Sequence, residues 1–320
     1  MVRGVRAIRF HRYGPADVLR WEEAPDPTPR RGEVRVRVRA AGLNPKDVLV
    51  RKGKLRLFTR GRFPQGSGYD LAGEVDALGP GVRSLRLGEP VFAMIQSWRA
   101  GACAELAIVP EGQLAPKPSS ISMTEAAGVP LAALTALQAL RDLLRIRRGQ
   151  RVALNGASGG VGVFAVQIAR ILGADTTAVC SARNAEWVRA LGADRVLPYD
   201  ERPLAEASET FDAVFDIFGT APHPRVKHLL SERGRYVTTI PNAQNAARDV
   251  LTRFTSRPAR LVVVRSRRRD LAQLARWIDA GELAPVIDRV WPMTDAAEAH
   301  RYLETKRAKG KVVLEVPERA

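Results

Sequence analysis

The stretch VALNGASGGVG, residues 152–162, joins an apolar run typical of a strand to a glycine-rich turn. An amphipathic helical pattern follows over residues 164–172. Gly159 would let the backbone approach a pyrophosphate without an intervening Cβ, and Gly162 would allow close packing between helix and strand. The helix N-terminus would present free N–H groups and partial positive charge to the phosphates. The order strand, glycine turn, helix therefore predicts a dinucleotide-binding βαβ unit.

The turn departs from the usual pattern at one position, since alanine stands where the first glycine is normally found. A purely structural turn can carry the same letters, but the strand before it and the helix after it favour a cofactor site. The residues expected to contact the cofactor here are Ala157, Ser158, Gly159, Gly160, Val161 and Gly162.

The segment after the next predicted strand, residues 176–180, indicates which cofactor is bound. An NAD site places Asp or Glu about 20 residues beyond the glycine turn, against the ribose 2′-hydroxyl. This chain has Ser181 and Arg183 there, a hydroxyl and a guanidinium that can bind a 2′-phosphate. Tyr199, after the third strand, is a further candidate contact. The alternative is that Ser181 and Asn184 only cap the following helix and that Arg183 is solvated. The two interpretations are compatible, because a helix N-terminus is itself an anion site. We expect NADPH rather than NADH.

Composition sets the broad class of protein. A chain of 320 residues with 45% hydrophobic and 27% charged residues is expected to be globular and to form two domains. Two cysteines, Cys103 and Cys180, are too few for a disulfide framework, which fits a reducing cytoplasm. No apolar run approaches the roughly 20 residues that a membrane-spanning helix needs, so no membrane is expected.

The formal charge of +17 could suggest a nucleic-acid partner. However, 43 of the 51 basic residues are arginines scattered along the whole chain, and aromatic residues do not alternate with them. Two basic clusters, residues 51–62 and 265–269, are interpreted as solvated faces that also attract an anionic cofactor. No specific nucleic-acid function is therefore expected.

The pattern of apolar residues divides the chain into parts. Residues 1–120 contain short strand patterns separated by Pro and Gly, and residues 34–39 alternate Val and Arg as in a half-buried strand. Residues 121–264 alternate strand and helix, which predicts a doubly wound parallel sheet. Residues 265–320 are expected to return to the first domain.

The predicted elements can be given by residue number. Helices are expected at 124–128 and 131–146. The strands of the parallel sheet are expected near 151–155, 176–180, 194–197, 212–217, 234–240 and 261–264, and its helices near 160–172, 184–191 and 222–232. The chain is expected to end with helices at 270–280 and 295–305 and a strand at 311–316.

Motifs along the whole chain point to one family. These are YGP at 13–15, AGLNPKD at 41–47, GYDLAG at 68–73, PLAALTA at 130–136, the glycine turn, LGAD at 191–194, FDAVFD at 211–216 and GKVVL at 310–314. In this order they resemble the zinc-independent branch of the medium-chain dehydrogenase/reductase family, the quinone oxidoreductase-like (zeta-crystallin-like) group. The resemblance implies an α/β fold in which a GroES-like β-barrel domain carries an inserted Rossmann domain, with the active site in the cleft.

The positions that hold catalytic zinc in metal-dependent relatives carry other residues here. The matching residues are Asn44, Tyr69 and Leu131, of which the first two are poor zinc ligands and the third cannot bind a metal. The four histidines show no paired ligand spacing, so no metal is expected. Without a Lewis acid, simple alcohol oxidation is not expected, and direct hydride transfer to an already electrophilic acceptor remains.

The resemblance therefore implies an NADPH-dependent reductase of a quinone or an α,β-unsaturated carbonyl. One alternative is an enoyl-thioester reductase in lipid or polyketide biosynthesis, where Arg51, Lys52 and Arg56 would steer an anionic carrier. Another is an RNA-binding or regulatory protein that retains the cofactor fold.

Three residues are candidates for donating to the acceptor oxygen. Asn44 could donate its amide N–H, Tyr69 its hydroxyl, and Lys46 could stabilise an enolate or supply the proton. Each has a structural alternative: turn chemistry for Asn44, a cleft wall for Tyr69 and a solvated charge for Lys46. Thr135 matches a family position that touches the nicotinamide. Asp47 and Asp70 are expected to hold the barrel loops together.

A homodimer is the expected oligomer. The last strand of the parallel sheet, residues 261–264, is short and apolar, and it should lie at the sheet edge, where it could pair with a second chain. Arg265 and the arginines at 267–269 would repel one another if a twofold axis brought them together, so dissociation at low salt is expected if this basic run lies near the interface.

Overall fold

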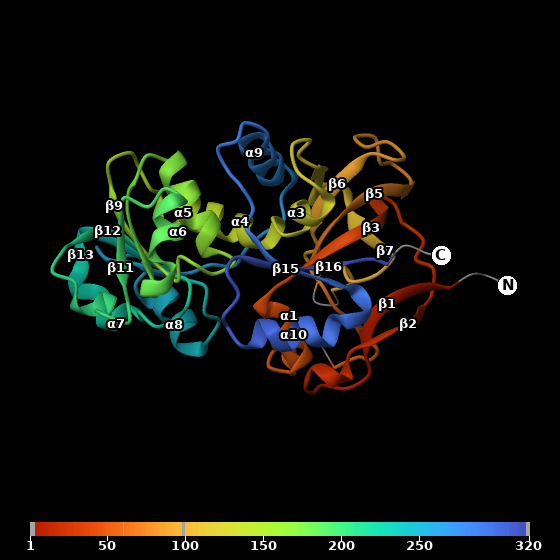
Figure 1. Cartoon of the computed structure of the whole chain (residues 1–320), viewed down its shortest axis with the longest axis horizontal. Coiled ribbons are helices and arrows are strands. Elements are labelled where there is room, and N and C mark those ends of the chain that lie inside the picture. The colour runs from red at the N-terminus through yellow and green to blue at the C-terminus, as the bar shows by residue number, and fades with distance from the viewer. Residues whose placement is uncertain (1–3, 60, 98–99, 318–320) are drawn as a thin grey trace. The chain divides into compact units, whose positions relative to one another are not determined.

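A computed structural model describes residues 4–59, 61–97 and 100–317, and the chain forms two compact units (Figure 1). One unit comprises Met1–Ala132 together with Arg265–Ala320, and the other comprises Ala133–Val264. The second unit is therefore an insertion between two segments of the first, and both ends of the chain belong to the first unit.

The first unit is built on strands that are mostly antiparallel. A seven-stranded sheet has the order β15-β16-β3-β5-β6-β8, with β7 also paired to β3, and a three-stranded sheet has the order β2-β1-β4. The bounds are β1 Val5–Phe10, β2 Arg20–Ala24, β3 Glu33–Leu43, β4 Gln65–Gly66, β5 Asp70–Leu78, β6 Pro90–Met94, β7 Leu106–Pro110, β8 Leu114–Pro116, β15 Ile287–Pro292 and β16 Lys311–Glu315.

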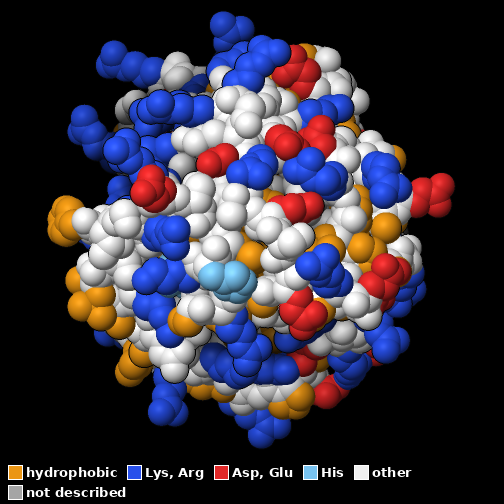
Figure 2. Space-filling model, turned by 90° about the vertical axis from the view of Figure 1, so that its left-hand side faces the viewer, with side chains coloured by type: hydrophobic (Ala, Val, Ile, Leu, Met, Phe, Trp, Pro, Cys, Tyr) orange, Lys and Arg blue, Asp and Glu red, His pale blue; other side chains and the backbone are white. Residues whose placement is uncertain are grey.

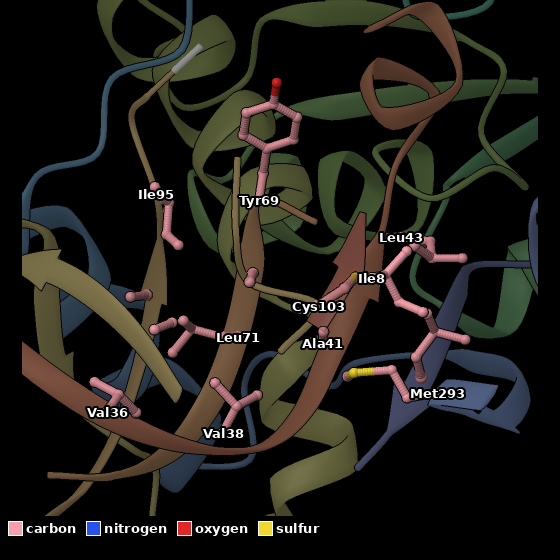
Figure 3. Packing of buried hydrophobic residues seen from close by; sticks show 14 of the residues in the cluster. Ile8, Val36, Val38, Ala41, Leu43, Tyr69, Leu71, Ile95, Cys103 and Met293 are labelled. Atoms are coloured by element: carbon pink, nitrogen blue, oxygen red, sulfur yellow. The ribbon is translucent and has the colours of Figure 1, made fainter. Parts of the chain in front are cut away.

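The alternation of Val and Arg in β3 gives the sheet a buried and a solvated face. Val34, Val36 and Val38 are at most 2% exposed, and their side chains belong to the apolar cluster of which Figure 3 shows a part. On the other face Arg35 pairs with Asp76 at 2.7 Å and Arg39 pairs with Glu74 at 3.0 Å. The predicted half-buried strand is confirmed.

Helices complete the first unit. They are α1 Pro45–Arg51, α2 Arg56–Thr59, α3 Met123–Ala127, α9 Arg268–Asp279 and α10 Ala296–Glu304, while α4 Pro130–Leu137 crosses the boundary to the second unit. Strand β16 pairs with β3 antiparallel and with β15 parallel. The helices predicted at 270–280 and 295–305 and the strand at 311–316 are confirmed within two residues at each end.

The second unit contains a six-stranded parallel sheet of order β11-β10-β9-β12-β13-β14. The strands are β9 Arg151–Asn155, β10 Asp175–Cys180, β11 Arg195–Pro198, β12 Phe211–Asp216, β13 Leu230–Thr238 and β14 Ala259–Leu261. The helices are α5 Gly162–Ile171, α6 Ala185–Ala190, α7 His223–Val226 and α8 Ala243–Leu251. The strand order runs outward from β9 in both directions, so the predicted doubly wound fold is confirmed.

Four details of the second unit differ from prediction. The helix expected at 222–232 ends early, because Leu230 is buried and already pairs with Phe211 as part of β13. The helix expected at 131–146 changes at Gln138–Leu144 into a π-helix. Helix α8 was not predicted, since it buries no residue. β14 is the edge strand, as expected, but it spans Ala259–Leu261 and shares only Leu261 with the strand expected at 261–264.

Candidate active site

The glycine-rich turn connects β9 to α5 in the second unit. Gly156 has a φ of 97°, a left-handed conformation that glycine adopts without strain. At Gly162 an added Cβ would lie 2.1 Å from the carbonyl oxygen of Gly156. Only glycine fits at position 162, because the backbone of the turn packs directly against the first residue of the helix.

Gly159 differs from these two glycines. Its φ is outside the left-handed region, and an added Cβ would meet only one described atom within 4 Å, the Gly156 oxygen at 3.6 Å. The protein itself therefore does not require glycine at this position. A glycine facing open space just before a helix N-terminus is what close approach of a phosphate requires. The turn therefore fits the pyrophosphate of a dinucleotide.

The segment after β10 lies beside this turn. The side-chain amide of Asn184 donates to Ser158 Oγ at 3.2 Å, and its oxygen accepts from Trp187 Nε1 at 3.2 Å. Ser181 is 6% exposed, and neither its side chain nor that of Asn184 caps the following helix. The alternative interpretation of these two residues as helix caps is therefore wrong, and the two predicted cofactor segments lie in contact.

The remaining predicted residues of this region, Arg183 and Tyr199, are exposed. The backbone N–H of Tyr199 donates to the Cys180 oxygen at 2.9 Å, which holds the end of β11 against the end of β10. The sequence analysis missed Asp200, whose carboxylate accepts the N–H of Ala182 at 2.8 Å. Its position just after the third parallel strand was the signal that could have identified it, because such strand ends meet at one edge of the sheet.

In the first unit, a buried polar network surrounds Asn44. The carboxylate of Asp47 accepts two backbone N–H groups, from Asn44 at 2.8 Å and from Gly68 at 2.9 Å. Asn44 Nδ2 donates to Asp70 at 2.9 Å and to the Gly42 oxygen at 3.3 Å. Both amide hydrogens of Asn44 thus have partners inside the protein, so the contacts do not support its predicted role as donor to a substrate.

Lys311, at the start of β16, completes this network. Its ammonium donates to the side-chain oxygen of Asn44 and, at 3.0 Å, to the backbone oxygen of Leu43, and it lies 3.7 Å from Asp70. The other Asp70 oxygen accepts the N–H of Leu131 at 2.8 Å and so fixes the start of α4. The predicted role of Asp47 and Asp70 in holding loops agrees with these contacts, whereas Lys311 had been noted only as part of a motif.

Burial changes the titration of these groups. It raises the pKa of Asp47 to about 6 and that of Asp70 to about 6, although backbone N–H groups and lysines oppose the shift. Burial also lowers the pKa of Lys311, with Asp70 acting in the opposite direction. Asp47 and Asp70 each accept two hydrogen bonds, and Lys311 donates two. Because these bonds replace the contacts with water, the three groups can remain ionised inside the protein.

Tyr69 and Lys46 lie next to this network. The Lys46 ammonium stands 3.7 Å from the centroid of the Tyr69 ring, a cation–π arrangement. Tyr69 is fully buried, and within the described residues its hydroxyl has no hydrogen-bond partner. Burial lowers the pKa of Lys46 and raises that of Tyr69. Thr135, the predicted nicotinamide contact, is buried on α4 in the second unit.

The basic cluster at 51–62 is only partly a solvated face. The Arg51 side chain is 1% exposed, forms an ion pair with Glu304 and donates to the Gly14 oxygen at 3.1 Å. Lys52 pairs with the same Glu304. Arg51 therefore holds α1 to α10, and the prediction that it steers an anionic carrier is wrong. Elsewhere, Figure 2 shows Lys and Arg side chains scattered over one face with Asp and Glu among them.

The described part of the chain contains neither a metal-binding cluster nor a membrane-spanning helix. No group of three or more His, Cys, Asp or Glu residues there is arranged to hold a metal ion. No helix in the same residues combines the length and apolar character that a membrane span needs.

Comparison with known proteins identifies the family. Residues 30–119 match the alcohol dehydrogenase GroES-like domain, and residues 191–314 match the model described as a zinc-binding dehydrogenase. A chloroplast envelope quinone oxidoreductase homolog of Arabidopsis thaliana is 32% identical over 97% of this chain and 98% of its own. The NADPH-dependent alkenal/one oxidoreductase of the same plant is 33% identical, over 97% of this chain and 79% of its own.

A solved structure leads to the same family. The quinone oxidoreductase from Coxiella burnetii superposes with a TM-score of 0.92 at 30% identity, covering 98% of this chain and 100% of its own. The chain belongs to the quinone oxidoreductase-like group of the medium-chain dehydrogenase/reductase family. It is an oxidoreductase, and the family binds a nicotinamide cofactor.

Proposed function

We propose that this protein is an NADPH-dependent reductase that transfers hydride to a quinone or to an α,β-unsaturated carbonyl compound. The observation that carries the cofactor assignment is the contact between Asn184 and Ser158, which sets the Ser181–Arg183 segment beside the glycine turn. The names of the Arabidopsis relatives, a quinone oxidoreductase homolog and an NADPH-dependent alkenal/one oxidoreductase, support the acceptor class.

The nicotinamide would supply the hydride, and the protein would stabilise the negative charge that develops on the acceptor oxygen. Lys46 and Tyr69 are the proposed donors to that oxygen. Lys46 suits proton transfer because burial lowers its pKa from the usual value, against the opposing effect of Asp47 and Asp70, and so makes its proton easier to give up. Tyr69 suits hydrogen bonding because its buried hydroxyl has no partner among the described residues and burial keeps it protonated. Asn44 is proposed as a positioning residue, because Asp70 and Gly42 already accept its amide hydrogens.

Zinc-independence is part of this proposal and rests on the chemistry of the available donors. The side chain of Asn44 is already hydrogen-bonded to Asp70, Gly42 and Lys311. Tyr69 would have to ionise in a buried site to bind a metal, and the side chain of Leu131 has no atom that could do so. These residues make a poor ligand set for zinc. Elemental analysis of the purified protein is expected to find far less than one zinc per chain, and stoichiometric zinc that restores lost activity would contradict the proposal.

The cofactor assignment is tested by equilibrium binding of NADPH and NADH, followed by nicotinamide fluorescence. The protein is expected to bind NADPH at least about tenfold more tightly, a difference of about 1.4 kcal/mol. Arg183→Ala should remove most of this difference and leave NADH binding nearly unchanged. Equal affinity of the unaltered protein for the two cofactors would refute the NADPH assignment.

The acceptor assignment is tested separately by following NADPH oxidation with a panel of quinones, enals and enoyl thioesters. Turnover is expected with quinones or enals, and Tyr69→Phe and Lys46→Met should each lower kcat roughly 100-fold or more. Lys54→Met, the same change at an exposed lysine of the nearby basic cluster 51–62, is the matched control and should leave kcat unchanged. Turnover of enoyl thioesters alone would favour the lipid-biosynthetic alternative.

We also propose a homodimer in the cytoplasm. β14 forms one edge of the parallel sheet, and Val263 just beyond it is 73% exposed, so this edge is suited to pairing with a second copy. Both cysteines are buried and free, which is compatible with a reducing compartment. Light scattering at moderate salt should give twice the 35.0 kDa chain mass, and a monomer mass would argue against the dimer.

A further inference from the structure

The 3₁₀ helix Ala182–Asn184 that follows β10 donates a hydrogen bond at its N-terminus to a residue far along the chain. In an α-helix the residue just before the first turn is the preferred capping residue, and its side chain accepts an N–H of that turn. Here that residue is Ser181, and its side chain makes no capping bond. The N–H of Ala182 instead donates at 2.8 Å to the carboxylate of Asp200, which lies 18 positions further along the chain.

This contact puts a negative charge into the segment that carries Ser181 and Arg183. Asp200 Oδ1 accepts the N–H of Ala182, which lies between Ser181 and Arg183 in the sequence. The Tyr199 N–H donates to the backbone oxygen of Cys180, the residue just before Ser181. Asp200 is exposed, and the structure gives it no arginine or lysine partner among the described residues. Its charge is therefore not neutralised by an ion pair in the described structure.

We propose that Asp200 is a specificity-determining residue that limits the preference of this site for a 2′-phosphate over a 2′-hydroxyl. The inference rests on the proposed function, because it assumes that the Ser181–Arg183 segment meets the adenosine ribose. A carboxylate repels a phosphate dianion and can accept a hydrogen bond from a ribose hydroxyl. Arg183 therefore favours a cofactor with a 2′-phosphate, whereas Asp200 favours one with a 2′-hydroxyl. Asp200 also fixes the backbone of Ala182 through its hydrogen bond.

Two substitutions separate the charge of Asp200 from its capping bond. Asp200→Asn keeps an oxygen that can accept the Ala182 N–H but removes the negative charge. Asp200→Ser is a second neutral variant with an acceptor, for use if the first does not fold. Glu201→Gln is the matched control, because it removes the neighbouring exposed carboxylate and changes the net charge equally.

The experiment measures calorimetric binding of 2′,5′-ADP and 5′-AMP, which differ only in the 2′-phosphate, to the full-length protein. Asp200→Asn should strengthen 2′,5′-ADP binding roughly fivefold, leave 5′-AMP within about twofold, and lose part of its gain at high salt. Glu201→Gln should change neither by more than about twofold. An unchanged ratio in both neutral variants would overturn the inference and leave Asp200 as a cap only.

The same titrations distinguish this failure from failure of the proposed function. If the unaltered protein prefers 2′,5′-ADP and Arg183→Ala removes that preference, the NADPH assignment stands whatever Asp200 does. If the unaltered protein shows no preference and Asp200→Asn creates one, the inference stands and the chain uses both cofactors. If neither Arg183→Ala nor Asp200→Asn changes the ratio of 2′,5′-ADP affinity to 5′-AMP affinity, the NADPH assignment and the inference about Asp200 are both refuted.

Discussion

The polar residues around Asn44 in the first unit and those beside the glycine turn in the second are used in opposite ways. Around Asn44 in the first unit, carboxylates, an amide and an ammonium satisfy one another and are shielded from water. At the glycine turn of the second unit, Gly159 faces open space and the Ser181 hydroxyl makes no capping bond. The same residue types thus stabilise the fold where the chain supplies their partners, and they are free to bind a ligand where it does not.

This comparison predicts where substitutions will act. Removing a charged group from the first unit should reduce the free energy of unfolding, because the remaining partners stay buried without compensation. Changing a residue at the glycine turn should mainly alter cofactor affinity, because few protein contacts are lost. The predictions below are arranged by the size of the expected effect.

The largest effect is expected for Lys311→Met. The substitution keeps the length of the side chain but leaves Asp70 buried without its lysine and Asn44 without a donor to its oxygen. The free energy of unfolding, measured by urea denaturation, should fall by about 3–5 kcal/mol. The control is Lys309→Met, an exposed lysine two residues earlier, which should change it by less than about 0.5 kcal/mol. A loss below 1 kcal/mol for Lys311→Met would show that the network is not a stabilising unit.

A pair of glycine substitutions tests the glycine turn itself. In Gly162→Ala the new Cβ meets the Gly156 oxygen, so the free energy of unfolding should fall by about 1–3 kcal/mol. In Gly159→Ala stability should stay within about 0.5 kcal/mol, while NADPH should bind about tenfold more weakly. Urea denaturation and fluorescence titration measure the two quantities independently. If Gly159→Ala binds NADPH normally, the open space beside it does not receive the phosphates.

The effect expected to be smallest near neutral pH concerns the titration of His300, a buried residue of the first unit. Within the described residues neither ring nitrogen has a hydrogen-bond partner, and burial lowers the pKa of His300 to about 3. The ordinary pKa of 6.5 applies to the unfolded chain, so between pH 6.5 and 3 the unfolded state binds the extra proton. His300 therefore makes stability fall with falling pH, by up to about 1.4 kcal/mol per unit.

His300→Leu should remove this dependence. The difference in free energy of unfolding between His300→Leu and the unaltered protein should grow as pH falls below 6.5. Taking the difference also cancels the contribution of Asp47 and Asp70, whose raised pKa values act in the opposite direction. Urea denaturation at several pH values measures it, and a difference independent of pH would mean that His300 is solvated in the folded protein.

The sequence predicted the central strands β9, β10 and β12 within one residue, because nearly all of their residues are buried in the sheet. β13 and β14 carry more polar residues, and their bounds differ from the prediction by two to four residues. The glycine turn and the segment at 181–184 could be recognised from local sequence, because each directly follows a strand of the parallel sheet and its role depends on neighbouring residues in the chain. Helix α8 and the early end of the helix at α7 could not be predicted, since the first buries no residue and the second depends on pairing with β12.

The buried network shows the other limit. Lys311 is 268 positions from Leu43, whose carbonyl it binds, and no local pattern marks it as buried. Arg51 is a similar case: its neighbours in the sequence suggest a solvated basic segment, while its partner Glu304 lies 253 positions away. Asp200 was missed because its partner Ala182 belongs to a different strand end. Each of these roles depends on a contact between distant segments rather than on local sequence.

The position of β16 also affects how the protein is made. β16 lies between β15 and the end of β3, yet the ribosome synthesises it after β3 and after the whole second unit. At about 5–20 residues per second, the 268 positions from Leu43 to Lys311 take roughly 13–54 s to translate. During that time the Ala40–Leu43 part of β3 lacks its pairing with β16, and Asn44 and Asp70 lack their contacts with Lys311. The inserted second unit, complete before then, is free to fold first.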